Sequence, residues 1–587
     1  MEHFDSEIEI REPKISRRIY LDTESRSLLE ALRSALLFAK STKELEIVIP
    51  KGVYNIPETE QKEYFMLSDL EDVTINGQGS ELIFSSPVPY FDLYKSKGIK
   101  IKNLILDWDW DKKPLAAVGV VTAISPDGQY IDFTYPTVDT VDENKPFSIV
   151  GPFDRKRYTP GENRAFEFRP YKNKHFHAED TEMEKLVREL SNIFVEGSAE
   201  RVGKNILRFK TYNPEWGKTH FSIGQCFNFR YFEYDGCAVK GAKCSEITLE
   251  DITIHGCPGH GFLFSGGVEK IHFQRCKIAP KPGTDRSISI SVDCLHVGNS
   301  KGMIVIENCD FSYAGDDCIN LHDNSSMGIE RLDEKILKAY RVDEKAMQFE
   351  SGSVIEIRNP DLSPTTFSAN VENVEYNAEK RYAILKLDRQ IPECLSPDCI
   401  IFNRSFHTDY YIIRNNRFSN NRARGILLQS SHGRVENNVF ENIQGAAIQI
   451  ETGAESRWSE GQGVLDLLIQ NNTIRSCDLN GWQMAVIYMG VYLPSGRTDY
   501  PVFKDIEISN NTIVDIPRQA FFSSSADNVL FANNTIINAM QRDLEENSYG
   551  SSQQEEPIYN ERYEVVVQGY KTTNLIVENN KIVSTLI

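Results

Sequence analysis

The chain has 587 residues, of which 40% are hydrophobic and 26% charged, and its formal net charge is −20. These values are typical of a large soluble globular protein. The negative charge argues against nucleic acid and anionic membrane surfaces as partners, because both are bound through clustered Lys and Arg. No stretch approaches the roughly 20 apolar residues of a membrane-spanning helix, so we expect no membrane span.

The N-terminal segment predicts a helix that caps a sheet. Residues 1–18 have no apolar core and are not a signal peptide as they stand. We therefore expect a cytoplasmic protein if the chain is full length, and a periplasmic or secreted one if a leader was removed. Residues 25–40 place apolar side chains along one stripe of a helix, which suits the open edge of a sheet. A partner-binding helix is a second interpretation. The stripe consists of Leu28, Leu29, Leu32, Ala35, Leu36 and Ala39.

A six-residue phrase recurs along the chain: an apolar residue, a variable one, two polar or small ones (often Asn-Asn), a variable one, then Ile or Phe. Each copy alternates with period two, as a strand with one buried face must. The Asn pair fits a bend at which side-chain amides stack between successive copies. Clear copies begin at Ile413, Val435, Ile469, Ile508, Phe531 and Val577, and weaker ones at Ile101, Leu249, Phe273 and Ile306.

A single copy cannot bury its apolar face, whereas stacked copies bury a continuous core. The repeat therefore predicts an all-β protein with a right-handed parallel β-helix. Leucine-rich repeats are the alternative architecture, but the helical half of each unit is missing. Cysteines within the repeats, such as Cys276 and Cys309, are expected to fill the interior as free thiols. Because no CxxC is paired with a second one, we expect no zinc site.

Two segments lack the phrase and carry alternating strand patterns instead, so we predict inserted β-barrel or sandwich subdomains. The first is also expected to contain a short helix around residues 183–194. Both insertions adjoin the acid-bearing part of the coil and are expected to wall a pocket. The predicted division is 1–107 (cap and first rungs of the coil), 108–232 (first insertion), 233–326 (rungs with the acids), 327–401 (second insertion) and 402–587 (C-terminal rungs).

Three acids form the candidate catalytic group: Asp293, Asp316 and Asp317. The last two lie 23 and 24 residues after the first, about one rung of a three-sided coil, so the carboxylates should stack. Crowded carboxylates have separated pKa values, as the acid and base of a glycoside hydrolase require. One rung plus side-chain reach suits the roughly 6.5–9.5 Å of an inverting enzyme. A solvated ladder of acids and a Ca²⁺ site remain alternatives.

The adjacent pair presents a difficulty, because successive residues of a strand point to opposite faces. We expect Gly315 to supply a β-bulge that lets Asp316 and Asp317 reach the same face.

Residues 292–296 (VDCLH) and 314–322 (AGDDCINLH) are similar to motifs of two groups of β-helical glycosidases. In the polygalacturonases of glycoside hydrolase family 28, an Asp precedes a GDDC element by a comparable distance. Their downstream Arg-Ile-Lys is replaced here by residues 422–429 (RARGILLQ), so the Lys that would recognise a uronate is absent.

The closer resemblance is to glycoside hydrolase family 110, the exo-acting α-1,3-galactosidases that remove terminal galactose from blood-group B and related glycans. It spans nearly the whole chain, and its most specific parts are residues 292–296, 315–320, 421–429 and 445–448, with Glu451 and Trp458 following. The resemblance implies a β-helix with inserted β-barrels and an inverting, metal-independent reaction without a cofactor. The implied partner is a glycan that ends in α-linked galactose.

The resemblance also implies roles for single residues. Asp293 matches the general acid, and Asp316 and Asp317 match the acids that activate water. The residues implied to contact galactose are Arg424, Gln429, Glu451 and Trp458.

Each of these sugar-contacting assignments has an alternative. Arg424 could bond a neighbouring rung, Trp458 could belong to the core, and Glu451 could be a solvated loop charge. His296 and His322 could bond a galactose hydroxyl or hold a carboxylate in place.

At the level of the whole protein, a polygalacturonase-like hydrolase and a non-catalytic glycan-binding β-helix remain alternatives. The large insertions could also form a homodimer interface.

Overall fold

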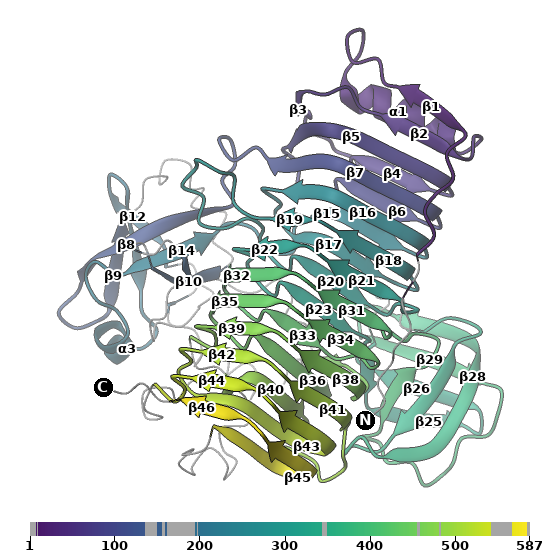
Figure 1. The fold of residues 1–587 in the computed structure, drawn as a ribbon, viewed down its shortest axis with the longest axis vertical. Coiled ribbons are helices and arrows are strands. Elements are labelled where there is room, and N and C mark those ends of the chain that lie inside the picture. Colours follow the sequence, from purple (N-terminus) through teal and green to yellow (C-terminus); the bar gives the residue numbers. More distant parts are fainter. Residues whose placement is uncertain are drawn as a thin grey trace.

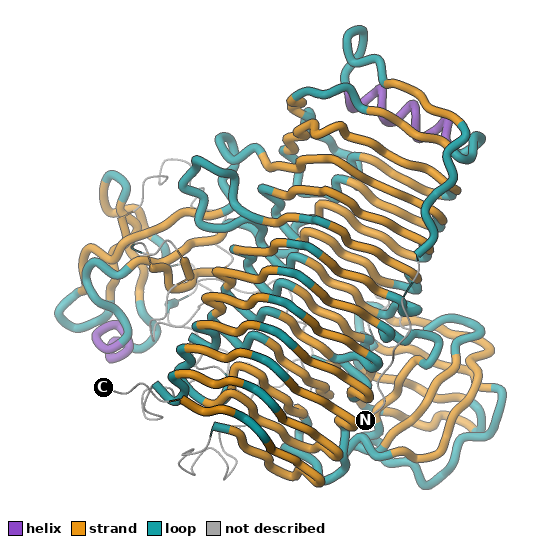
Figure 2. Tube along the Cα trace, in the orientation of Figure 1, coloured by secondary structure: helices purple, strands orange, loops and turns teal. Residues whose placement is uncertain are grey.

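The computed structural model describes residues 8, 10–134, 149–154, 156, 159–160, 194–195, 198–342, 349–454, 458–479, 483–541 and 566–583. Its main body is one coil of parallel strands that stack along the long axis of the molecule (Figures 1 and 2). Distant parts of the sequence pair in register on this coil. Thus Ile306 lies opposite Ile413, which lies opposite Val435. The predicted parallel β-helix is confirmed.

The coil has three faces, each a column of strands from successive rungs. Face A contains β4 (Phe65–Ser68), β6 (Phe91–Tyr94), β15 (Cys237–Ala242), β17 (His260–Ser265), β20 (Leu295–Gly298), β23 (Ile319–His322), β33 (Ile426–Leu428), β36 (Ile448–Ala454), β40 (Ala485–Tyr492) and β43 (Gln519–Ala532). This face continues past the two rungs that carry the predicted acids.

Face B contains β1 (Arg17–Tyr20), β2 (Leu45–Val48), β5 (Glu71–Phe84), β7 (Lys97–Trp108), β16 (Ser245–Ile254), β18 (Glu269–Gln274), β21 (Ile304–Glu307), β31 (Tyr411–Arg414), β34 (Gly433–Glu436), β38 (Val464–Gln470), β41 (Phe503–Ser509) and β45 (Val567–Glu578). Face C contains β3 (Val53–Asn55), β19 (Lys277–Ile278), β22 (Asp310–Ser312), β32 (Arg417–Asn421), β35 (Val439–Ile443), β39 (Thr473–Arg475), β42 (Thr512–Val514), β44 (Thr535–Ile537) and β46 (Lys581–Val583). The long strands β5, β7, β16 and β43 pair on more than one face.

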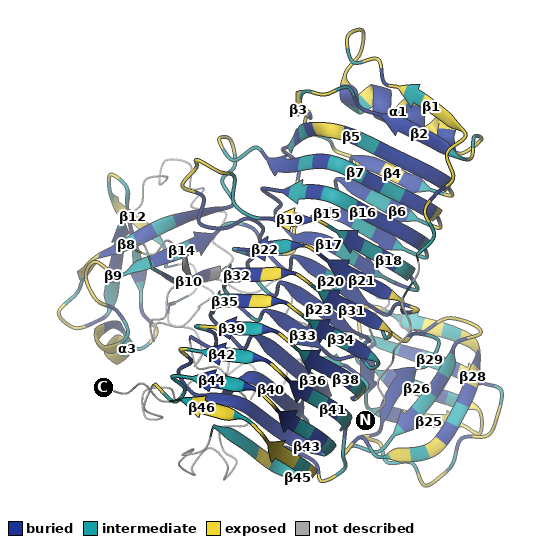
Figure 3. Cartoon of the chain, viewed as in Figure 1, coloured by how far each residue is buried: buried dark blue, intermediate teal, exposed yellow. Residues whose placement is uncertain are grey.

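The interior of the coil is apolar, and Figure 3 shows buried residues along every rung. Repeat positions such as Ile306, Phe418 and Ile513 are fully buried. The interior cysteines Cys276 and Cys309 are buried as predicted, and all eleven cysteines are free.

The Asn pairs form the predicted stacks at the bend between faces B and C. The backbone N–H of Asn438 donates to Oδ1 of Asn472 at 2.9 Å, and the rungs between Asn416 and Asn580 repeat this bond. The first Asn of each pair adopts a positive φ, for example +56° at Asn437, which Asn tolerates better than most residues. We call this stack the amide ladder; its members are Asn416, Asn438, Asn472, Asn511, Asn534 and Asn580.

Helix α1 (Leu28–Ala39) covers the N-terminal end of the coil, as predicted (Figure 1). It begins at a capping box in which Ser27 and Glu30 satisfy each other's backbone N–H groups. Its apolar stripe is buried against the first rungs, except that Leu29 is half-buried. No described helix is both long and apolar enough to cross a bilayer.

Each insertion contributes an antiparallel sheet beside the coil (Figure 1). In the first, Phe133 packs edge-on against Phe209, Phe227 and Phe229. Its elements are β8 (Ala116–Ile124), β9 (Tyr130–Thr134), β10 (Ile149–Asp154), β11 (Thr159–Pro160), β12 (Glu200–Gly203), β13 (Ile206–Lys210), α3 (Pro214–Thr219) and β14 (Cys226–Arg230). The short helix predicted around 183–194 falls outside the described residues, apart from Phe194.

The second insertion has a separate apolar core that includes Leu337, Ile355 and Leu385. Its strands are β24 (Ser325–Met327), β25 (Ile329–Asp333), β26 (Ile336–Tyr340), β27 (Val354–Arg358), β28 (Pro364–Asn377), β29 (Tyr382–Leu387) and β30 (Ile400–Asn403). Inserted β-rich subdomains are therefore present, while the predicted domain boundaries stay predictions.

Candidate active site

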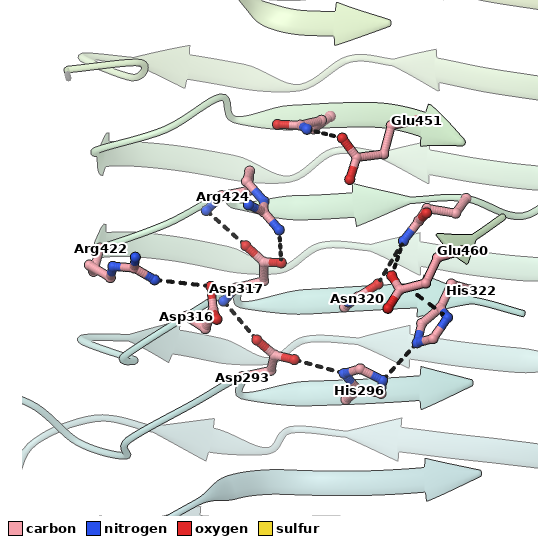
Figure 4. Close-up of polar contacts among 12 residues, drawn as sticks. Asp293, His296, Asp316, Asp317, Asn320, His322, Arg422, Arg424, Glu451 and Glu460 are labelled. Carbon is pink, nitrogen blue, oxygen red and sulfur yellow. Dashed lines mark hydrogen bonds and ion pairs between the residues drawn. The ribbon is translucent and has the colours of Figure 1, made fainter. Parts of the chain in front are cut away.

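The three predicted acids come together on face A. Asp293 lies two residues before β20, and Asp316 and Asp317 lie in the bend before β23, the next strand of that face. One carboxylate oxygen from each of the three lies within 4.8 Å of the others (Figure 4). The stacking of successive rungs thus brings three carboxyl groups together at one point of face A.

Hydrogen bonds between rungs hold the two buried acids. The backbone N–H of Asp317 donates to Oδ1 of Asp293 at 2.9 Å. One rung further on, the backbone N–H of Arg424 donates to Oδ1 of Asp317 at 3.0 Å, and its guanidinium donates to Oδ2 at 2.8 Å. We call this sequence of contacts the acid ladder.

Asp316 and Asp317 differ in environment because they lie in a bend rather than a strand. Asp317 is buried, whereas the Asp316 side chain is 30% exposed and forms an ion pair with Arg422 at 3.1 Å. The buried amide of Asn421 donates to the Asp316 carbonyl at 2.6 Å and so fixes this bend.

The β-bulge predicted at Gly315 is wrong. Gly315 is in the same bend, and a Cβ there would lie less than 3.0 Å from the Ser291 carbonyl oxygen and from Arg230. Arg230, from the first insertion, donates to the carbonyls of Ser291 at 3.1 Å and Gly315 at 2.6 Å. Gly315 therefore makes room for an arginine that joins the insertion to the acid-bearing rungs.

The predicted separation of 6.5–9.5 Å between acid and base stays a prediction, because the 4.8 Å bounds only the closest approach of single carboxylate oxygens. Asp293 and Asp317 occupy corresponding positions on adjacent rungs, whose strands stack roughly 4.8 Å apart. Their side chains point the same way (Figure 4).

Burial dominates the protonation of the two ladder acids. It raises the pKa of Asp293, and the hydrogen bond from His296 opposes that rise. It raises the pKa of Asp317 well above its usual range, against the opposing charge of Arg424. A raised carboxyl pKa is what a general acid needs in order to carry a proton near neutral pH.

A chain of polar groups leads from Asp293 across face A (Figure 4). Its Oδ2 lies 2.8 Å from Nδ1 of His296, and Nε2 of His296 lies 2.8 Å from Nε2 of His322. Nδ1 of His322 lies 3.8 Å from Oε2 of Glu460. Burial lowers the pKa of His322 to about 4, whereas Asp293 raises that of His296 against the effect of burial. Both histidines therefore contact the acid network.

His260, which sequence analysis did not place in the site, adds a third histidine. Its Nε2 lies 3.8 Å from Oδ2 of Asp293. Burial lowers the pKa of His260 to about 3, so this ring is neutral at physiological pH.

Among the residues expected to contact sugar, Gln429 and Trp458 meet at Glu460. Gln429 donates to Oε2 of Glu460 at 2.9 Å, and the Trp458 side chain also bonds this carboxylate. Trp458 is half-buried; its ring covers the backbone of Gly453 and meets Tyr492 edge-on at 5.9 Å. The ring lies over the surface of face A rather than in the core.

Arg424 and Glu451 lie beside the acids on the next two rungs. Arg424 bonds a neighbouring rung, as the alternative interpretation expected, and its partner there is Asp317. Glu451 is buried on β36 and accepts a hydrogen bond from Gln449, so it is not a solvated loop charge.

Arg422 and Glu460 belong to the site, although no role was predicted for them from the sequence. Arg422 lies within the quoted motif at 421–429, so its neighbour Arg424 could have pointed to it. Glu460 lies on β37 (Ser459–Glu460), a two-residue strand outside the repeat, where no sequence signal singles it out.

The contacts of the acid oxygens argue against the Ca²⁺ site considered from the sequence. Ca²⁺ takes six to eight oxygen ligands. Here both oxygens of Asp293 and both of Asp317 already face N–H groups or a histidine nitrogen, and the cationic Arg424 contacts Asp317. These residues fit proton transfer better than cation binding.

Comparisons with known proteins extend the likeness to most of the chain. A family profile described as a right handed beta helix region matches residues 398–484. A protein of Bacteroides fragilis named alpha-1,3-galactosidase A is 26% identical over 547 residues, covering 86% of this chain and 84% of that protein. A Bacteroides thetaiotaomicron protein named alpha-1,3-galactosidase B is 27% identical and covers 84% and 80%. A solved family 28 exopolygalacturonase of Yersinia enterocolitica aligns at a TM-score of 0.40 and 12% identity, covering 96% and 78%. Over most of its length, the chain is thus similar to bacterial proteins named as α-1,3-galactosidases.

Proposed function

We propose that the chain is an exo-acting α-1,3-galactosidase of the glycoside hydrolase family 110 type, which hydrolyses terminal α-1,3-linked galactose from glycans. The acid cluster of Asp293, Asp316 and Asp317 is the observation that carries this proposal. The substrate follows from the relatives, which match over most of the chain and are named for this activity.

In the proposed reaction, Asp293 is the general acid. Its neutral form donates a proton to the glycosidic oxygen as the bond to galactose breaks. Asp293 suits this role because it is buried, its pKa is raised by that burial, and a histidine lies 2.8 Å from its Oδ2.

Asp316 and Asp317 are proposed to activate the attacking water: Asp316 deprotonates it, and Asp317, whose pKa burial raises, positions it. Asp316 has the access that water requires, with a side chain 30% exposed, and Arg422 holds it in place. Attack on the side opposite the leaving group gives β-galactose, with inversion of configuration.

The proposed galactose site extends from the acids along face A to the rungs of Arg424 and Glu451. Carboxylate and guanidinium groups bond sugar hydroxyls strongly. The half-buried Trp458 offers an aromatic surface for the apolar C–H face of galactose. Gln429 and the two histidines complete the polar groups expected to contact or position the sugar.

The experiment that tests this proposal measures galactose released from Galα1-3Gal, with Galα1-4Gal and polygalacturonate as parallel substrates. We expect turnover of the first only, and its loss in Asp293→Asn. Asp310→Asn is the matched control, because Asp310 lies on face C, pairs with Lys277 and is 37% exposed. Galactoside binding without turnover would contradict the proposal in favour of a glycan-binding protein. Cleavage of polygalacturonate would contradict it in favour of the other hydrolase.

A further inference from the structure

Glu460 is a half-buried charge for which the proposed reaction has so far provided no role. The inference drawn from it rests on the proposed function. Its side chain is 19% exposed and accepts a hydrogen bond from Gln429 at 2.9 Å. Burial would raise its pKa, but His322, the Gln429 hydrogen bond and His296 together hold it below the usual range. Glu460 is therefore ionised at neutral pH.

An ionised carboxylate cannot donate a hydrogen bond, and its negative charge attracts a nearby proton. Oε2 of Glu460 lies 3.8 Å from Nδ1 of His322, beyond hydrogen-bond distance, and Nδ1 forms no hydrogen bond with the described residues. The charge of Glu460 therefore favours the neutral ring with its proton on Nδ1. Glu460 and the backbone of Asp323 also raise the pKa of His322, against the larger effect of burial. With Nδ1 protonated, Nε2 of His322 is an acceptor.

The same constraint passes to His296. Its Nε2 lies 2.8 Å from the accepting Nε2 of His322, so His296 must carry a proton there. Its other nitrogen, Nδ1, lies 2.8 Å from Oδ2 of Asp293. One proton then lies between these two atoms: either Asp293 is neutral and donates to Nδ1, or Nδ1–H donates to ionised Asp293.

We propose that Glu460 is a positioning residue for the general acid. Through His322 and His296, it keeps one transferable proton between His296 and Asp293. When that proton goes to the glycosidic oxygen, Asp293 is left ionised and His296 neutral. The next proton enters from solvent at His296, whose side chain is 20% exposed.

Other charged and titratable groups face the Asp293–His296 pair. They also affect the pKa of the shared proton, and they are unchanged in the Glu460 variants. In the described part of the chain, they come from several elements of face A and from the bends that precede them. They are His260 on β17, Asp316 and Asp317 before β23, His322 on β23, and Arg424 before β33.

Two substitutions separate the charge of Glu460 from its hydrogen-bond acceptor. Glu460→Gln keeps an acceptor but removes a negative charge that favours the shared proton. The alkaline limb of the kcat/KM profile on Galα1-3Gal should therefore move to lower pH, by about 1 unit for a charge at this range. Glu460→Met also removes the acceptor, and activity should fall about 10²-fold, as for loss of a general acid.

Glu307→Gln is the matched control. Glu307 is a buried glutamate bonded to a histidine, with Oε1 3.0 Å from Nε2 of His272, but it lies on face B. This variant should leave both the alkaline limb and the activity unchanged.

A second readout does not depend on turnover. In protein labelled with ¹³C at histidine Cδ2, the chemical shift of His322 distinguishes the Nδ1–H from the Nε2–H tautomer; His296→Gln and His322→Gln assign the signals. We expect Nδ1–H in the wild type and in Glu460→Gln, and Nε2–H in Glu460→Met.

Several results would overturn the positioning role. One is an Nε2–H tautomer of His322 in the wild type, and another is an alkaline limb that does not move in Glu460→Gln. A rise in KM with an unmoved pH profile would instead make Glu460 a sugar contact. If the wild type released no galactose while the tautomer of His322 changed as expected, the proposed function would fail, and only the effect of Glu460 on the proton of His322 would stand.

Discussion

Two hydrogen-bond ladders connect the rungs of this coil, and they differ in chemistry more than in geometry. In the amide ladder, the backbone N–H of Asn438 donates to the side chain of Asn472 at 2.9 Å. In the acid ladder, the backbone N–H of Asp317 donates to the side chain of Asp293 at the same distance. The amide ladder donates toward the C-terminal rungs and the acid ladder toward the N-terminal ones.

The difference shows how one backbone device can serve either stability or chemistry. An Asn side chain also donates, as Asn438 does to the Ile413 carbonyl at 2.8 Å, so every polar atom finds a partner within the stack. An Asp side chain has no donor when ionised. Its second oxygen must find a donor elsewhere, and here the donors are His296 and Arg424. The acid ladder thus keeps titratable groups in contact with proton carriers.

Among the substitutions that test this comparison, replacing an acid of the acid ladder with an amide should lower kcat/KM the most. Asp317→Asn keeps an acceptor for the Arg424 backbone N–H but removes the carboxyl group that is proposed to position the attacking water. We expect kcat/KM to fall by about 10³-fold with the fold retained. The measurement is galactose release, with circular dichroism to check folding and Asp310→Asn as control. A variant that kept more than a tenth of wild-type activity would contradict the role of Asp317.

The reverse substitution tests the amide ladder. Asn472→Asp loses the donor to the Val435 carbonyl and to Asn511, and leaves acceptors facing acceptors in a buried stack. We expect the free energy of unfolding to fall by about 3 kcal/mol, measured by urea denaturation. Asn437→Asp changes an exposed residue in the same bend and should cost less than about 0.5 kcal/mol. Equal losses in the two variants would show that the ladder contributes nothing specific.

The shared proton predicts a pH dependence. Burial raises the pKa of Asp293, and Asp293 raises the pKa of His296 above its ordinary 6.5 against the effect of burial, so the proton stays bound above that pH. Activity should fall as pH rises through the alkaline limb, whose midpoint should lie above 6.5. A kcat/KM profile with this midpoint below 6.5 would mean that Asp293 and His296 do not share the proton.

Chelation of metal ions should have the smallest effect on activity. Because the ladder acids already face nitrogen donors, we expect EDTA to leave galactose release unchanged, and added Ca²⁺ to do the same. A tenfold loss that calcium restored would instead support the Ca²⁺ site considered from the sequence.

The regular part of the fold was predictable because its information is local and repeated. Each Asn pair marks its own bend, so the stacking of Asn416 on Asn438 follows from the period alone. The same period placed Asp293 beneath Asp317. The repeat does not predict the conformation of the bends. In one of them Gly315 makes room for Arg230, a residue 85 positions earlier in the chain.

The site residues outside the repeat were the hardest to predict. Glu460 reaches His322 from a two-residue strand that pairs with β36, and nothing in the local sequence distinguishes it from a solvated charge. The separation between the carboxyl groups of the acids stays a prediction of the sequence. The compartment and a homodimer stay predictions of the sequence.

The most direct test of the proposed mechanism is a proton NMR time course of Galα1-3Gal hydrolysis in D₂O, recorded before the released sugar mutarotates. Asp293 as acid, with Asp316 and Asp317 holding water, predicts that β-galactose forms first. If α-galactose formed first, one of these acids would be a nucleophile and the proposed inversion would be wrong.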